Sequence, residues 1–408
     1  MPANDIYMKR ACEIAFTMMG KTSPNPAVGA VIVKNNNIIG EGGTGKYGGD
    51  HAEVTAIKNA RKRGNDIEGA SIYVSLEPCS HHGKTPPCTD AIIKSGIKKV
   101  FTPLLDPNPL VSGNGIRQLA DAGIEIKIMH KHFSSASDLV RGFKKYILRN
   151  RPFIINKCAM TLDGRIAATS GDSKWISNTF TRLFVHKLRA KVDAVIIGKN
   201  TFMKDNPMLN VRFDEFDDDT KKFFSVNTPK ISGRENFFLE KLLKDDIPDY
   251  REPLRVMIGI PEIIPAGSNF FRDNNYIIIA GENEYRDAVN MNPELKSFYE
   301  GLNIAVKRFN SNDESIGFVM ETLKDRGVMT ALLEGGGTVN GSFFNAGEID
   351  QFIYVIAPKV LGSGISPING ERTEKISDSL ILRDISTVMI DNNMLINGYK
   401  EEYNFEMM

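Results

Sequence analysis

The sequence predicts two consecutive domains of the α/β class. The chain is 408 residues long, and a single hydrophobic core stops growing at roughly 250–300 residues. Hydrophobic residues make up 41% of the chain and charged residues 25%, as in folded globular proteins. In both halves, strand-like and helix-like segments alternate with short connections. This pattern is typical of a mostly parallel sheet covered by helices.

The first half contains a complete alternating series. Apolar residues recur with helical spacing over 7–19, and a Val- and Ile-rich strand pair over 27–39 turns near 35–37. The elements expected next are a helix at 54–63, a strand at 71–76, a helix at 89–95, a strand at 98–102, a helix at 115–122 and a strand at 123–128. A basic helix at 133–150 ends the series, because Pro152 disfavours helix in the residue before it. We therefore expect domains at 1–150 and 151–408.

The second half repeats this alternation over a longer stretch. Its expected strands are 153–159, 192–197, 254–259, 276–280, 330–333 and 351–357, the last of them a buried final strand. Residues 213–252 are rich in Asp, Lys and Phe and lack clear periodicity. We expect that segment to be an elaborated surface loop.

Charge and composition exclude several classes of protein. The chain has 51 Lys and Arg against 50 Asp and Glu, a net charge of +1, which gives no reason to expect binding to a long polyanion. No apolar run approaches the roughly 20 residues of a membrane span, and Asp5 lies where a signal peptide would be apolar. Four cysteines are too few for a disulfide scaffold. We expect a cytoplasmic protein that binds neither nucleic acid nor membrane.

The most specific local pattern is a set of zinc-type ligands. His51 and Glu53 are the first and third residues of the triplet His-Ala-Glu. Cys79 follows a proline, and Cys88 comes after the loop of residues 80–87. One His and two Cys suit Zn²⁺ and leave a fourth position for water, whose pKa the metal lowers toward neutrality. Glu53, at a helix start, is placed to shuttle a proton without binding the metal. The pattern is the signature of zinc-dependent deamination of a pyrimidine or purine ring.

The motif departs from one known pattern and leaves one alternative open. Eight residues, 80–87, separate the two cysteines, whereas the nucleic-acid-acting deaminases have two residues between them. A structural zinc site would take His81 or His82 as a fourth ligand, and the chain would then be a zinc-stabilised interaction module. That reading does not explain Glu53. The remaining cysteines, Cys12 and Cys158, lie in apolar stretches and are expected in the core.

Several motifs together resemble the family of bifunctional riboflavin-biosynthesis deaminase–reductases. In the first half they are Ser-Pro-Asn-Pro at 23–26, Val-Gly-Ala at 28–30, the zinc motif through Cys88 and Asp-Pro-Asn-Pro at 106–109. In the second half they are Lys157, Thr-Leu-Asp-Gly at 161–164, Gly-Asp-Ser-Lys-Trp-Ile at 171–176, Asp-Asn-Pro at 205–207 and Glu-Gly-Gly at 334–336. The resemblance covers nearly the whole chain apart from 213–252.

The resemblance implies a fold and a two-step activity. The fold is a cytidine-deaminase-like three-layer α/β domain followed by a dihydrofolate-reductase-like α/β domain. The first domain would use zinc to deaminate 2,5-diamino-6-(5-phosphoribosylamino)pyrimidin-4-one by hydrolysis. The second would use NADPH to reduce the ribosyl group to a ribityl chain. The family also implies a homo-oligomer, a dimer or tetramer, built through the reductase halves.

The resemblance also assigns residues to each site. In the deaminase it places Asn25 near the ring and three residues at the ribose-phosphate arm: Lys84, Asp106 and Asn108. At NADPH it places Ile176, Gly198, Thr201, Gly335, Gly336 and Thr338. At the reductase substrate it places Lys157, Ser173, Trp175, Arg189, Asp205, Arg212 and Glu334. One feature departs from the family, which usually has a His in the stretch where this chain has Thr44 and Gly45.

Side-chain chemistry is compatible with these roles. Gly198 and Gly335 each follow a predicted strand, where free backbone N–H groups at a helix start can hold phosphate, although neither segment matches Gly-x-Gly-x-x-Gly. Arg189 and Arg212 offer planar paired donors to a phosphate. Lys157, Asp205 and Glu334 are candidates for proton transfer; the plainer reading of each is a surface ion pair.

A competing enzyme class is a nucleoside or nucleic-acid base deaminase with an accessory domain. That class predicts a basic, aromatic groove and no NADPH binding. The net charge of +1 and the motifs of the second half argue against it.

Overall fold

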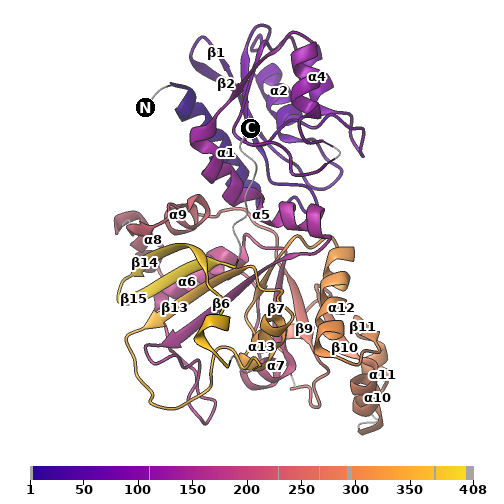
Figure 1. The fold of residues 1–408 in the computed structure, drawn as a ribbon, viewed down its shortest axis with the longest axis vertical. Coiled ribbons are helices and arrows are strands. Elements are labelled where there is room, and N and C mark those ends of the chain that lie inside the picture. Colours follow the sequence, from indigo (N-terminus) through magenta and orange to yellow (C-terminus); the bar gives the residue numbers. More distant parts are fainter. Residues whose placement is uncertain are drawn as a thin grey trace. The chain divides into compact units, whose positions relative to one another are not determined.

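The computed structural model describes residues 3–109, 111–227, 229–265, 267–291, 296–371 and 374–400. Within them the chain forms two compact units (Figure 1). The first unit contains residues up to 150 together with 236–250, and the second contains 151–235 and 251 onward. Residues 401–408, the end of the expected second domain, lie outside the described part. No helix in the described part is long and apolar enough to cross a membrane.

The first unit is built on a five-stranded sheet with the order β2-β1-β3-β4-β5. β3, β4 and β5 are parallel, and β1 runs antiparallel to both of its neighbours. The strands are β1 Gly29–Lys34, β2 Asn37–Gly43, β3 Ser71–Val74, β4 Lys99–Thr102 and β5 Glu125–Ile128. The helices are α1 Ala3–Met18, α2 Ala52–Lys62, α3 Cys88–Lys94, α4 Asn114–Asp121, α5 Phe133–Arg149 and α9 Phe237–Lys244.

Helices cover both faces of this sheet. α1 packs on β1, and α5 and α9 pack with α1, whereas α2 packs on β2 and continues through α3 to α4. Glycines permit the close approach: a Cβ on Gly29 would lie 2.1 Å from the carbonyl oxygen of Ala11, and one on Gly42 would lie 2.3 Å from the backbone nitrogen of Ala56. The predicted three-layer α/β domain is confirmed.

The second unit contains a ten-stranded sheet with the order β11-β10-β9-β7-β12-β6-β13-β15-β14-β8. It is parallel from β11 to β13 and antiparallel from β13 to β8. The strands are β6 Phe153–Thr161, β7 Ala194–Gly198, β8 Ile231–Gly233, β9 Leu254–Ile258, β10 Tyr276–Gly281, β11 Ile304–Lys307, β12 Thr330–Leu333, β13 Gln351–Ala357, β14 Arg383–Ile390 and β15 Asn393–Tyr399.

The helices of the second unit enclose an aliphatic core. They are α6 Thr179–Arg189, α7 Lys199–Asp205, α8 Asp218–Val226, α10 Glu282–Met291, α11 Lys296–Glu300, α12 Asn312–Asp325 and α13 Gly337–Asn345. A buried cluster joins the central strands to α12 and α13 through residues such as Ile196, Leu333 and Leu323. The prediction of a second α/β domain is confirmed.

Two expectations for the second half are wrong. Strand β13 is not the last strand, because the antiparallel hairpin of β14 and β15 follows it. β14 alternates buried and exposed residues, so it lacks the continuous apolar run of a buried strand.

The segment 213–252 is also more than a loop, since it contains α8, β8 and α9. Asp217 caps α8 by accepting a hydrogen bond from the backbone N–H of Thr220, and Asn236 caps α9 in the same way. Asp and Asn are favoured N-cap residues, so these two positions could have predicted the starts of both helices from the sequence.

Gly42→Ala is expected to destabilise the first unit by roughly 1–3 kcal/mol, because the added methyl overpacks the contact between β2 and α2. Urea unfolding followed by circular dichroism should show an earlier transition for this unit. The fluorescence of Trp175, the one tryptophan of the chain, reports on the second unit and should keep its midpoint.

Gly317→Ala is the matched control, because a Cβ at that position in α12 meets no atom within 4 Å. Alanine should stabilise that helix by up to about 1 kcal/mol. An unshifted first transition in Gly42→Ala would contradict the packing argument.

Candidate active sites

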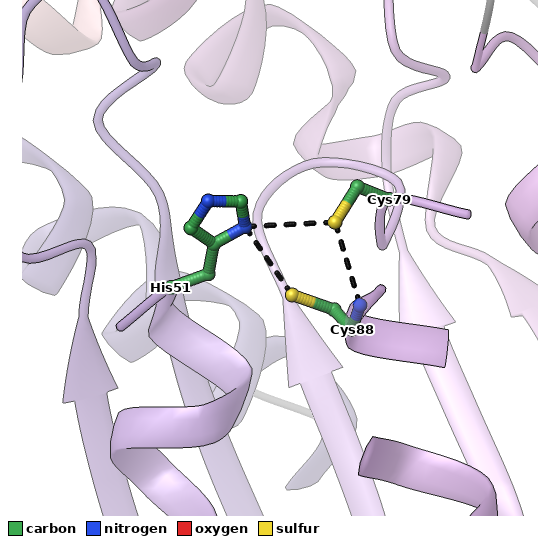
Figure 2. A group of neighbouring side chains, drawn as sticks. All are labelled: His51, Cys79 and Cys88. Atoms are coloured by element: carbon green, nitrogen blue, oxygen red, sulfur yellow. Dashed lines mark hydrogen bonds between the residues drawn. The ribbon is translucent and has the colours of Figure 1, made fainter. Parts of the chain in front are cut away.

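Three metal-type ligands converge in the first unit. His51 immediately precedes α2, Cys79 lies in the chain after β3, and Cys88 begins α3 (Figure 2). The His51 Nδ1 atom lies 3.5 Å from the Cys79 sulfur and 3.3 Å from the Cys88 sulfur. All three ligand atoms are within 4.8 Å of one another. This donor set and spacing fit a tetrahedral zinc ion with three protein ligands.

The protonation of the two thiols favours metal binding. The hydrogen bond from Cys88 is the main cause that lowers the pKa of Cys79 to about 4, whereas the same contact and burial raise the pKa of Cys88. Without metal, the pair therefore holds one thiolate at neutral pH. Zinc binding removes the remaining proton, so metal affinity is linked to pH.

Glu53 lies in the first turn of α2 and is 4% exposed. Burial is the main cause that raises its pKa to about 7. A carboxyl group with a pKa near neutrality can both accept and donate a proton at working pH. The predicted proton shuttle is thus buried in the cavity that also contains His51 and Cys79.

A cavity of about 420 Å³ joins the metal ligands to the predicted substrate residues. Asn25, Lys84, Asp106 and Asn108 all line it, together with Glu53. Burial raises the pKa of Asp106 to about 7. The sequence analysis missed several further lining residues, among them Tyr47, Phe143, Tyr146 and Ile147.

The structure bears on the departure from the family at Thr44 and on the alternative of a structural zinc site. Thr44 also lines this cavity and accepts a hydrogen bond from the backbone N–H of Val28 at 3.1 Å. His82 is exposed, and neither it nor His81 joins the ligand cluster of the described residues. The cluster therefore has the three ligands of a catalytic zinc site rather than the four of a structural one.

The second unit has its own cavity, of about 480 Å³. The predicted residues that line it are Lys157, Ser173, Trp175, Ile176, Arg189, Arg212, Glu334 and Gly335. Gly198, Thr201, Asp205, Gly336 and Thr338 do not line it. The side chain of Trp175 is exposed, and the guanidinium of Arg182 lies 4.5 Å from its ring centroid.

A buried ion pair lies in this second cavity. Arg189 donates from Nε and Nη2 to the two carboxylate oxygens of Glu334, each at 2.8 Å. Burial opposes ionisation of Glu334, but the charge of Arg189 lowers its pKa to about 2. Much of the Arg189 guanidinium is thus committed to Glu334 rather than to a ligand. The ammonium of Lys157, whose pKa burial lowers, has no hydrogen bond or ion pair among the described residues.

His186 is a cavity residue that the sequence analysis missed. Its Nδ1 accepts a hydrogen bond from the backbone N–H of Arg212 at 3.0 Å, and burial lowers its pKa to about 3. The imidazole is therefore neutral, with its proton on Nε2. His186 lies three residues before Arg189 on α6, so both side chains share one helix face, and this spacing was the available sequence signal.

The two glycine turns lie side by side. β7 and β12 are adjacent parallel strands, and each continues into a helix, with Gly198 preceding α7 and Gly336 preceding α13. A Cβ on Gly336 would lie 3.7 Å from the hydroxyl oxygen of Thr201. Neither helix start has a side-chain cap. Their free N–H groups therefore fit the phosphates of a dinucleotide.

Three zinc-type ligands beside a buried carboxylate are the donor set of a hydrolytic base deaminase. Residues 1–103 match the cytidine and deoxycytidylate deaminase zinc-binding region, and residues 152–396 match the RibD C-terminal domain. The chain thus belongs to the RibD family of bifunctional riboflavin-biosynthesis deaminase–reductases.

Similar proteins cover both units. The chain is 36% identical to the riboflavin biosynthesis protein RibD of Aquifex aeolicus over 395 residues, 96% of each chain. Identity to the Escherichia coli protein of that name is 32%, over 92% of this chain and 94% of the relative. A crystal structure of the Thermotoga maritima diaminohydroxyphosphoribosylaminopyrimidine deaminase/5-amino-6-(5-phosphoribosylamino)uracil reductase has a TM-score of 0.76 and 32% identity, covering 97% of this chain and 98% of that one.

These findings decide between the two enzyme classes. The protein is a bifunctional enzyme of riboflavin biosynthesis, with a zinc-dependent deaminase domain and an NADPH-dependent reductase domain. It acts on a small-molecule pyrimidine. The reading as a nucleic-acid base deaminase with an accessory domain is not supported.

Removal of zinc is expected to expose one reactive thiol. After chelation, Cys79 should be alkylated rapidly at pH 7, because its pKa of about 4 makes it a thiolate. Burial raises the pKa of Cys12 to about 12 and that of Cys158 to about 11, so both should stay unmodified. Mass spectrometry of iodoacetamide-treated protein, with and without zinc, measures this. Equal labelling of Cys79 in the two samples would argue against it as a zinc ligand.

Proposed function

We propose that residues 1–150 carry out the deamination and residues 151–408 the reduction, with specific roles for individual residues. In the first step, His51, Cys79 and Cys88 hold the zinc, which when bound supplies a Lewis acid that activates water. Glu53 carries the proton from water to the leaving amino group. The observation that carries this assignment is the burial of Glu53 beside the three ligands in one cavity.

Four further residues are proposed to bind the diaminopyrimidine ribotide. Asn25 contacts the ring, while Lys84, Asp106 and Asn108 contact the ribose-phosphate arm. Support comes from their common cavity and from Lys84, whose ammonium lies 4.1 Å from the ring centroid of Tyr47. A lysine held against an aromatic face remains free to meet a phosphate.

For the second step, we assign the residues to two ligands, NADPH and the reductase substrate. NADPH, which supplies the hydride, binds along the glycine turns through Ile176, Gly198, Thr201, Gly335, Gly336 and Thr338. The sugar phosphate and pyrimidine bind Lys157, Ser173, Trp175, Arg189, Asp205, Arg212 and Glu334. Lys157 is the proposed proton donor, supported by its place in the cavity, where it is partly buried, and by the lack of a described partner. For Asp205 the proposal depends on the family motif at 205–207 alone.

We also propose a cytoplasmic homo-oligomer, dimer or tetramer, that does not bind nucleic acid. All four cysteines are free thiols, as expected in a reducing compartment. Ile385, Met389 and Met394 expose apolar side chains on the hairpin of β14 and β15. An exposed apolar face on this hairpin supports association through the second unit.

Glu53→Gln is expected to reduce ammonia release from the diaminopyrimidine ribotide roughly 10²–10⁴-fold, because the amide cannot carry the proton. Bound zinc should stay at the wild-type level, and NADPH-dependent reduction of the deaminated intermediate should be unchanged. Ammonia release at the wild-type rate would show that another group moves the proton.

Lys157→Ala is expected to show the reverse pattern. NADPH oxidation with the deaminated substrate should fall at least tenfold, because the proposed proton donor is removed from the cavity, while ammonia release from the first substrate is retained. Lys324→Ala is the control, because this partly exposed lysine of α12 lines neither cavity, and the variant should keep both activities. Loss of both activities in a folded Lys157 variant would contradict the assignment to the reductase alone.

A further inference from the structure

Glu77 is a buried carboxylate that none of the proposed steps uses. It lies two residues before the zinc ligand Cys79 and is 3% exposed. Both of its oxygens accept hydrogen bonds from backbone N–H groups. Oε2 accepts from Asp106 and from Gly113, each at 3.0 Å, and Oε1 accepts from Ile116 at 3.2 Å.

These bonds hold both ends of one loop. The loop connects β4 to α4 and presents Asp106 and Asn108 to the deaminase cavity. Glu77 binds the loop at Asp106, where it enters the cavity, and again at Gly113, where α4 begins. Within the loop, Asp106 accepts a hydrogen bond from the N–H of Asn108 at 2.8 Å.

Glu77 also caps α4 from outside that helix. Gly113, at the N-cap position, has no side chain to satisfy the first N–H groups, and the Glu77 carboxylate accepts the N–H of Ile116, the third residue of the helix. A negative charge at a helix N-terminus is also favoured by the helix dipole. The approach is close, since a Cβ on Gly115 would lie 2.0 Å from the carbonyl oxygen of Pro78.

We infer that Glu77 is a positioning residue, which sets the substrate-arm loop at a fixed place relative to the zinc ligand Cys79. The inference depends on the proposed roles of Asp106 and Asn108. A carboxylate suits the task because it only accepts hydrogen bonds, and its two oxygens together meet three N–H groups. Glutamine has one oxygen, so its NH₂ group would face at least one N–H donor of the loop.

Glu77→Gln tests the inference. We expect a roughly tenfold rise in KM for the ribotide, since at least one arm contact is displaced, with a smaller change in kcat and full zinc content. The rise should shrink when the same pyrimidine lacks its phosphate. Adding Glu77→Gln to Asn108→Ala should raise KM little beyond the effect of Asn108→Ala alone, because both changes remove the same contact.

Asp5→Asn is the matched control. Asp5 is a buried carboxylate of the same unit that pairs with Lys131 and His132 and does not line the cavity. Its amide variant should lose stability and keep the wild-type KM. Gly115→Ala is a second variant, because its added methyl group would push α4 away from the Glu77 segment while Glu77 stays intact. It should also raise KM for the ribotide, and it tests the inference if Glu77→Gln does not fold.

Hydrogen exchange supplies a readout that does not depend on the substrate. Glu77→Gln should speed the exchange of the backbone amides at residues 106, 108 and 111–116 and leave those of α1 unchanged. Unchanged exchange, or an unchanged KM with a lower kcat or lost zinc, would overturn the inference. If the wild-type protein released no ammonia, the proposed function would fail, while faster exchange in the variant would still establish that Glu77 holds the loop.

Discussion

The first unit depends on one geometric constraint, the meeting of one nitrogen and two sulfur atoms within 4.8 Å. The ligands come from the start of α2, the chain after β3 and the start of α3. The backbone N–H groups of Cys88 and Thr89 bond to Cys79 and hold the two cysteine segments together, but α2 is positioned through the sheet. The sheet order brings β3 beside β1, and Gly40 and Gly42 let α2 lie directly on β2. The metal centre is therefore a product of the packing, and its chemistry follows from the burial that this packing imposes.

Burial alone does not decide the charge of a buried carboxylate, as two glutamates show. Glu53 and Glu334 both lie in cavities. Burial dominates at Glu53 and raises its pKa to about 7, whereas the charge of Arg189 overcomes burial at Glu334 and lowers its pKa to about 2. At neutral pH the first can exchange a proton and the second stays ionised. The absence or presence of a bonded guanidinium thus separates a proton shuttle from a fixed anion.

Sequence reasoning succeeded where the information was local and failed where it was not. The alternating elements and both α/β domains follow from periodicity and residue spacing, and the structure confirms them. It also brings the three predicted zinc ligands within 4.8 Å of one another. The helices α8 and α9 were missed because they are short, nine and eight residues, and lie in a segment without clear apolar periodicity. The bond between Arg189 and Glu334 joins residues 145 positions apart, and the neutral state of His186 depends on its burial and on the nearby charges of Arg189 and Arg212. The spacing of residues along the sequence does not predict such long-range interactions.

The near-zero net charge of the chain is compatible with a phosphate-bearing substrate, because some of the cations in the two cavities are paired with acids and others are not. Arg189 is bonded to Glu334, and Arg212 lies 2.8 Å from Glu215, so these arginines add little net charge to their cavity. Lys84 in the first cavity and Lys157 in the second have no carboxylate within ion-pairing distance in the described part of the chain. A dianionic phosphate gains most from a cation that no acid already neutralises. Each cavity thus retains a lysine suited to one small anionic ligand, although the whole chain carries a charge of only +1.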